Sequence, residues 1–177
     1  GIEPVAWMIA AGDLNSDHRD DIVVLGKDVT YVVRQNDKGE MQTPQSLINT
    51  SPQLSMVQVA DLNGDGRSDI CYLANEGSTR GLCARLQSND SRLGPEMRFS
   101  LQQPRSVTLA NIEQKPGHEV VTRDSRTGRV QISSLQPATS EDGVLPTRLL
   151  QYGIGQSGSN RDRAVAIGDV DGDRLTD

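Results

Sequence analysis

Three short loops carry oxygen-bearing side chains at alternate positions, with Asp or Asn at loop positions 1, 3, 5 and 9. Alternating side chains on a tight turn can point several oxygens at one centre, which suits a hard cation that takes six to eight oxygen ligands. A backbone carbonyl at position 7 and water would complete the set. We therefore predict Ca²⁺ in each loop, up to three sites in all. The predicted ligands are Asp13, Asn15, Asp17, Arg19 and Asp21; Asp61, Asn63, Asp65, Arg67 and Asp69; and Asp169, Asp171, Asp173, Leu175 and Asp177.

Calcium fits these loops better than the other common metal ions. Magnesium demands a stricter octahedron with more retained water, and zinc prefers nitrogen and sulfur ligands, which the ligand positions lack. An EF-hand needs a bidentate Glu at position 12, where two of these loops have Val24 and Tyr72. The competing interpretation is a set of solvated turns, because Asp, Asn and Gly are ordinary turn formers. Three copies in one register argue against it.

A fourth loop, residues 111–119, departs from the pattern. It has Asn111, Glu113, Lys115 and Glu119 at positions 1, 3, 5 and 9. The Lys places an ammonium group where a ligand oxygen should stand. We predict that this degenerate site binds no calcium and that Lys115 pairs with Glu113 or Glu119 as a built-in cation. The alternative is an exposed Lys beside a disordered turn.

Position 6 differs between the three intact loops. It is often a left-handed backbone position that favours Gly. Gly66 occupies it in one loop, whereas His18 and Arg174 occupy it in the others. We therefore expect weaker calcium binding in the loops of His18 and Arg174.

The loops belong to an internal repeat of about fifty residues. Their first ligand positions are separated by 48, 50 and 58 residues. Two apolar residues at spacing two precede each loop, which indicates a strand with one buried face. A small residue follows them, which suggests close backbone packing, and the residue after the first ligand is aliphatic, which should pin the loop to a core. The small residues are Gly12, Ala60, Ala110 and Gly168, and the aliphatic ones are Leu14, Leu62, Ile112 and Val170.

Three further strands are expected after each complete loop, and no segment has helical periodicity. The predicted ranges are 22–25, 29–34 and 42–48; 70–73, 81–86 and 97–101; and 120–122, 129–133 and 147–152. Four short strands per repeat predict an all-β chain built of β-propeller blades, each of four antiparallel strands. A two-sheet sandwich would not require a fifty-residue repeat.

The repeat predicts three blades and the first strand of a fourth. The expected limits are 1–50 for blade 1 with loop 13–21, 51–103 for blade 2 with loop 61–69, 104–158 for blade 3 with the degenerate loop 111–119, and 159–177 for the truncated blade 4. Three blades and one strand cannot close a ring, so we expect a fragment of a larger propeller. Open strand edges can pair with another chain, which raises the prospect of self-association.

Charge and hydropathy exclude two classes of partner. The chain of 177 residues has 18 basic and 24 acidic side chains, a net charge of −6, which argues against nucleic acid. Apolar runs are far shorter than the ~20 residues of a membrane helix, so no membrane insertion is expected. The three intact loops hold ten ligand carboxylates, so the remaining 14 acids face 18 bases. The excess of acid therefore resides in the loops.

The blocks VADLNGDGRSDI (59–70) and AIGDVDGD (166–173) resemble the FG-GAP/VCBS repeats of integrin α-subunit-like β-propellers. The resemblance implies a propeller of about seven blades with calcium in the loop between the first and second strand of a blade. It also implies an extracellular, periplasmic or cell-surface location and a role in adhesion or ligand binding. The Phe-Gly and Gly-Ala-Pro elements of the integrin version are missing, so the bacterial VCBS-like variant is the closer match.

Cys71 and Cys83 are the only cysteines and fall on neighbouring predicted strands of one repeat. A hairpin centred on Gly77 would place them directly opposite, within bridging distance. An exported protein would permit this disulfide, and similar secreted repeats carry a Cys pair in this region. The alternative is two reduced, buried thiols.

The leading interpretation is a non-enzymatic, calcium-stabilised propeller module of an exported protein that presents loops to a protein or carbohydrate ligand. In the family that the repeats resemble, the loops opposite the calcium form the ligand face; here these are residues 26–28, 75–80, 124–128 and 153–162. The alternative is a catalytic or non-catalytic propeller part of a secreted polysaccharide lyase or hydrolase, or of a large toxin. No catalytic nucleophile, base and orienting group can be assembled from the sequence, and the Asp residues repeat with the blades, whereas a catalytic site is normally unique.

Overall fold

The structure is a computed structural model that describes residues 8–77, 79–101, 104–124, 129–137, 144–152 and 167–173. Every regular element in this part of the chain is a β-strand. None of the described segments forms a helix with the length and apolarity needed to cross a membrane. The prediction of an all-β chain is confirmed.

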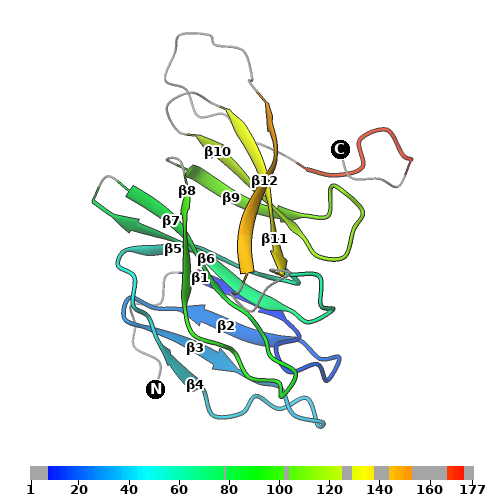
Figure 1. Cartoon of the computed structure of the whole chain (residues 1–177). Helices are drawn as coiled ribbons and strands as arrows, with labels where there is room; N and C mark the ends of the chain where they lie inside the picture. Colours follow the sequence, from blue (N-terminus) through cyan, green and yellow to red (C-terminus); the bar gives the residue numbers. More distant parts are fainter. Residues whose placement is uncertain are drawn as a thin grey trace. The chain divides into compact units, whose positions relative to one another are not determined.

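The strands form three antiparallel sheets of four strands, each connected in chain order as a meander (Figure 1). The first contains β1 (Met8–Gly12), β2 (Asp21–Leu25), β3 (Val29–Val33) and β4 (Gln45–Ile48). The second contains β5 (Leu54–Ala60), β6 (Asp69–Glu76), β7 (Thr79–Arg85) and β8 (Met97–Leu101). The third contains β9 (Pro104–Ala110), β10 (Glu119–Asp124), β11 (Val130–Pro137) and β12 (Val144–Tyr152). A four-stranded meander is the arrangement of a propeller blade.

The chain divides into two compact units. The first comprises residues 1–61 and 67–101, and the second comprises residues 62–66 and 102–177. The first unit therefore holds the first two sheets, and the second unit holds the third sheet. The blade limits expected from the repeat length stay predictions.

The first unit buries both faces of its central strand β6, since every residue from Asp69 to Ala74 is buried. Ile70, Tyr72 and Ala74 alternate along β6 and join one apolar cluster with Val23 and Leu25 of β2. In the second unit, Val121, Val130 and Ile132 form a smaller cluster with Ala110. The period of two follows from strand geometry, in which successive side chains point to opposite faces.

The small residue at the end of the first strand is explained by close packing in one repeat. A Cβ added to Gly12 would overlap the side chain of Val59 on β5. Strands β1 and β5 lie in contact within the first unit. The expectation of close backbone packing is thus confirmed at Gly12, whereas a Cβ at Gly168 would meet no described atom within 4 Å.

The prediction that Cys71 and Cys83 lie directly opposite is wrong. The β6–β7 hairpin pairs Cys71 with Ala84 and Tyr72 with Cys83, one residue away from the expected register. Because successive side chains of a strand point to opposite faces, the two cysteines lie on opposite faces of the sheet. Both are buried free thiols, and burial is the main reason that their pKa values rise, to about 12 for Cys71 and about 11 for Cys83.

Candidate metal centres

The candidate loops occupy the same place in every meander, between its first and second strands. Loop 13–21 joins β1 to β2, loop 61–69 joins β5 to β6, and the degenerate loop 111–119 joins β9 to β10. Position 9 of each loop is the first residue of the second strand. The side chains of Leu14 and Leu62 are buried, 0% and 1% exposed, and Leu14 joins the apolar cluster of the first unit. The expected anchor of the last loop, Val170, is instead 83% exposed.

Each loop turns through a left-handed backbone conformation at position 4. The φ angles there are 61° at Ser16, 76° at Gly64, 54° at Gln114 and 86° at Gly172. Sequence reasoning identified position 6 as the left-handed one and missed position 4, although the glycines at two of the four copies were a signal. Position 6 is also left-handed where the sequence predicted it, with φ of 65° at His18 and 81° at Gly66.

Asp13 organises the first loop through its carboxylate. Its Oδ1 accepts hydrogen bonds from the amides of Asn15 and Asp17, at 3.2 and 3.1 Å, and its Oδ2 accepts one from His18 at 2.8 Å. Burial of this carboxyl by itself disfavours the charged form, but the hydrogen bonds outweigh burial and hold the pKa of Asp13 below its ordinary value. The lowered pKa favours the ionised form of Asp13, the residue at loop position 1.

The next two predicted ligands are held in the same way in the first and second loops. Asn15 Nδ2 donates to Asp17 Oδ2 at 2.9 Å, and Asn63 Nδ2 donates to Asp65 Oδ2 at 2.9 Å. The amides of Asp17 and Asp65 donate back to the Asn side-chain oxygens at 3.1 and 3.2 Å. The repeated spacing in the sequence thus produces a repeated local geometry.

Position 9 has a structural role that the sequence did not reveal. Asp21 and Asp69 are 0% exposed and Glu119 is 3% exposed. Asp21 accepts hydrogen bonds from the amides of Leu14 and Gln35, at 3.2 and 3.0 Å, so it ties the start of the loop to the end of β3. Its pKa is raised, chiefly because burial disfavours the charge.

The three predicted ligand carboxylates of loop 13–21, those of Asp13, Asp17 and Asp21, do not form a compact cluster. Asp21 faces backbone amides, and Asp17 Oδ2 also accepts a hydrogen bond from Arg19 Nη2 at 2.9 Å. A cation at this loop would have to displace the guanidinium from Asp17. The Arg19 side chain is 37% exposed, so it can turn to solvent.

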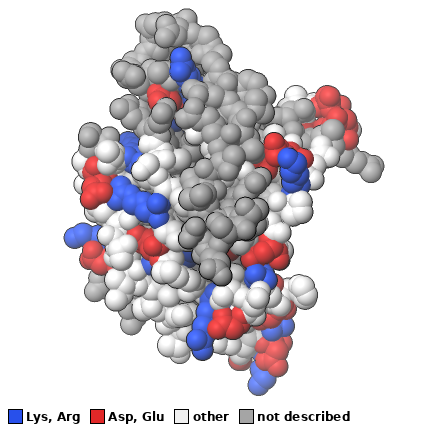
Figure 2. Space-filling model, in the orientation of Figure 1, with Lys and Arg blue, Asp and Glu red and all other residues white. Residues whose placement is uncertain are grey.

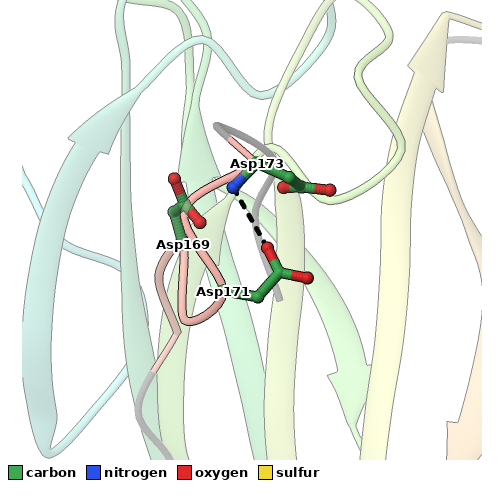
Figure 3. Close-up of side chains that lie close together, drawn as sticks. All are labelled: Asp169, Asp171 and Asp173. Atoms are coloured by element: carbon green, nitrogen blue, oxygen red, sulfur yellow. Dashed lines mark hydrogen bonds between the residues drawn. The ribbon is translucent and has the colours of Figure 1, made fainter.

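Asp169, Asp171 and Asp173 do come together (Figure 3). Each offers a carboxylate oxygen within 4.8 Å of the others, and all three are exposed. The amide of Gly172 donates to Asp169 Oδ1 at 2.6 Å, and the amide of Asp173 donates to Asp171 Oδ1 at 3.1 Å. The other two predicted ligands of this loop, Leu175 and Asp177, and Arg174 at its position 6, lie outside the described residues.

The degenerate loop contains the predicted ion pair. Lys115 Nζ lies 2.9 Å from Glu113 Oε2, so of the two predicted partners Glu113 is the one it contacts. Glu119 turns inward, and its Oε2 accepts hydrogen bonds from the amides of Ile112 and Glu113, at 2.7 and 3.3 Å. Position 5 thus supplies a positive charge to the loop.

The donor set fits calcium in the three intact loops and not in the fourth. In the intact loops the ligand positions offer oxygen, and adjacent carboxylates without a cation repel one another. In the degenerate loop an ammonium group stands at a ligand position and neutralises Glu113. Asp13, Asn15 and Asp17, their counterparts in loop 61–69, and Asp169, Asp171 and Asp173 are the side chains that could hold the ion.

The meanders and their loops place the chain among the all-β, propeller-type repeat proteins. Residues 9–72 match the family model of the FG-GAP-like repeat, so this part of the chain is similar to that repeat. The match covers the first loop, the second loop and the strands between them. No curated protein matches the chain.

Proposed function

We propose that the chain is a non-enzymatic, calcium-stabilised propeller module of an exported protein that presents its loops to a protein or carbohydrate ligand. The observation that carries this proposal is the repeated geometry of the loops. Two of them place the same Asn–Asp pair in the same hydrogen bonds, and a third gathers three carboxylates within 4.8 Å. Calcium in an extracellular or periplasmic location would bind these oxygens and neutralise their charge.

Calcium would also compensate for the lean core. A metal that binds only the folded state adds about 2.7 kcal/mol per site at a hundredfold excess over its dissociation constant. The ions would supply charge neutralisation and fixed loop geometry, and the protein groups would hold the loop ends to the strands. The recurrence of the Asp residues in successive repeats favours this structural role over catalysis.

Thermal unfolding tests the proposal. We expect excess calcium to raise the midpoint temperature by about 5 °C or more over the same protein in chelator, because ~1 kcal/mol corresponds to about 2–4 °C for a chain of this size. Magnesium should have a smaller effect. Isothermal titration should show no more than three bound ions, with none at the degenerate loop.

Asp171→Asn supplies the matched variant for this test, because it removes one carboxylate of the exposed cluster. Asp37→Asn removes an exposed carboxylate outside the loops and serves as its control. Asp171→Asn should reduce the rise in midpoint temperature caused by calcium, and Asp37→Asn should leave that rise unchanged. Equal midpoints in calcium and in chelator would overturn the proposal.

A further inference from the structure

Gln87 is a buried polar side chain in the connection between β7 and β8, and it is 2% exposed. Its Oε1 accepts a hydrogen bond from Ser16 Oγ at 2.6 Å, and its Nε2 donates to the carbonyl of Asp13 at 3.3 Å. Asp13 and Ser16 are positions 1 and 4 of the first loop. A residue of the β7–β8 connection therefore contacts the loop of the first sheet, more than seventy residues away in the sequence.

The same residue also holds the second loop at its base. The amide of Gln87 donates to Asp69 Oδ1 at 2.8 Å, its carbonyl accepts from Arg67 Nε at 3.2 Å, and its Nε2 donates to the carbonyl of Ser68 at 3.3 Å. These partners are positions 9, 7 and 8 of that loop. All of the polar groups of Gln87 are thus engaged with one or the other candidate metal loop.

A second residue of the same connection supports the first loop. Ser91 Oγ donates to the carbonyl of Asn15 at 2.8 Å, and the carbonyl of Ser91 accepts from Arg34 Nη2 at 2.8 Å. The first loop is consequently held at positions 1, 3 and 4 by the connection between β7 and β8. If the first loop moved on binding a cation, its hydrogen bonds to Gln87 would change. A movement of Gln87 would in turn alter its hydrogen bond to Asp69.

The repeats provide internal comparisons for Gln87. Val33, Arg85 and Ser133 are equivalent, because each pairs with the residue that follows loop position 9 in its repeat. Two residues further along the chain stand Gln35, Gln87 and Leu135, which are therefore equivalent too. The backbone amide of Gln35 donates a hydrogen bond to Asp21, as the backbone amide of Gln87 does to Asp69. Its side chain makes no hydrogen bond within the described part of the chain.

The third repeat has no side-chain amide at this position, because Leu135 replaces the glutamine. Leu135 is 3% exposed and lines a cavity of about 240 Å³ in the second unit, together with Leu62 and Asn63 of loop 61–69. Ser134, which also lines this cavity, has a buried hydroxyl with no hydrogen-bond partner among the described residues. The glutamine bridge to a preceding loop is therefore a particular feature of residue 87.

We propose that Gln87 is a positioning residue shared by loops 13–21 and 61–69, so that calcium binding at one loop favours calcium binding at the other. The proposal rests on the calcium function proposed above. Coupling requires an element whose arrangement both sites bias, and the side chain of Gln87 is that element. By reciprocity, each loop must strengthen binding at the other by the same factor.

Site-resolved calcium titration tests this coupling. Amide NMR shifts of His18 and Gly66 would report the two loops separately in the full chain. Disabling the second loop with Asp65→Asn should weaken binding at the first by about fivefold or more. In a Gln87→Leu background the same Asp65→Asn change should leave the affinity of the first loop unaltered, which completes a double-mutant cycle.

Gln35→Leu is the matched control, because it removes the equivalent side chain without breaking a bridge between loops. It should preserve the coupling. Ser16→Gly is the milder variant should Gln87→Leu fail to fold, since Gly is the natural residue at this position in loop 61–69. It removes the hydroxymethyl side chain whose hydroxyl meets Gln87. It should reduce the coupling.

The outcomes separate the two proposals. Absence of calcium binding at both loops would overturn the proposed function. Binding at both loops with no effect of Asp65→Asn on the first, or with equal coupling in wild type, Gln87→Leu and Ser16→Gly, would overturn the role of Gln87 alone.

Discussion

Glu96 lies just before β8, and its side chain is only 2% exposed. Its carboxylate accepts hydrogen bonds from the hydroxyl of Tyr72 at 2.6 Å and from the amide and hydroxyl of Thr50 at 3.2 and 2.8 Å. Arg85 Nη2 lies 3.6 Å away and compensates the charge. Burial opposes ionisation, but the hydrogen bonds from Ser51, Tyr72 and Thr50 outweigh it and lower the pKa of Glu96 below its ordinary value of 4.5. This network ties the segment after β4 to the second sheet.

Glu96→Gln should destabilise the protein at neutral pH by about 1–3 kcal/mol, because an amide NH₂ would replace an acceptor that faces several donors. A lowered pKa means that the wild-type carboxylate contributes stability above pH 4.5 and loses that contribution as the pH falls through the folded-state pKa. The gap between wild type and variant should therefore narrow below pH 4.5. Urea unfolding of both proteins from pH 3 to pH 7 measures this difference in the free energy of unfolding.

Glu76→Gln is the control for this prediction. Glu76 pairs with Arg98 at 2.6 Å but its side chain is 62% exposed. Exposed pairs are worth less than about 1 kcal/mol, so this variant should unfold close to wild type at every pH. A gap between wild type and Glu96→Gln that stays constant from pH 3 to pH 7 would contradict the role assigned to the Glu96 charge.

At the scale of the strands, the contact of β1 with β5 depends on the absence of a side chain at Gly12. Val59 fills the space where a Cβ would stand. Protein interiors are close-packed, so an inserted methyl group forces side chains or backbone to shift. The strand therefore ends on a small residue for a reason of packing, and the loop that follows begins from a fixed point.

Gly12→Ala should lower the free energy of unfolding by about 1–3 kcal/mol because of this overlap. Gly168→Ala, at the same position of the last repeat, should change it little, since no described atom lies within 4 Å of the added Cβ. Thermal or urea unfolding of the two variants in saturating calcium measures the difference. Equal stabilities would show that Val59 can move aside without cost.

At the scale of the whole molecule, the net charge of −6 comes from loop carboxylates. Figure 2 shows acidic and basic side chains interspersed over the described surface on the side drawn, without an extended basic face. Asp169, Asp171 and Asp173 form a group of three like charges whose carboxylate oxygens lie within 4.8 Å of one another. Such charges repel one another unless a cation or salt screens them.

Sodium chloride should therefore stabilise the protein in chelator more than it stabilises the calcium-loaded protein. Screening shortens the range of repulsion from about 30 Å at 0.01 M salt to about 8 Å at physiological ionic strength. Midpoint temperatures measured across this range, with and without calcium, give the comparison. A salt effect of the same size in both states would place the repulsion elsewhere.

Local sequence patterns predict the strands, the meander repeat and the positions of the loop oxygens. These features depend on neighbours in the chain: apolar residues at spacing two form half-buried strands, and alternating Asp and Asn on a turn face one another. The ion pair of Lys115 with Glu113 could be anticipated as one of two alternatives for the same reason, because the two residues are only two positions apart.

Strand register and contacts between distant segments could not be predicted from local patterns and became known from the folded chain. A one-residue change in the pairing of β6 with β7 moves Cys83 to the other face from Cys71, and no local pattern specifies that register. Three features depend on packing between distant segments: the burial of Asp21, the approach of Val59 to Gly12 and the hydrogen bond between Gln87 and Ser16. Their energies come from burial and from satisfying buried polar groups, and both exist only once the sheets have come together.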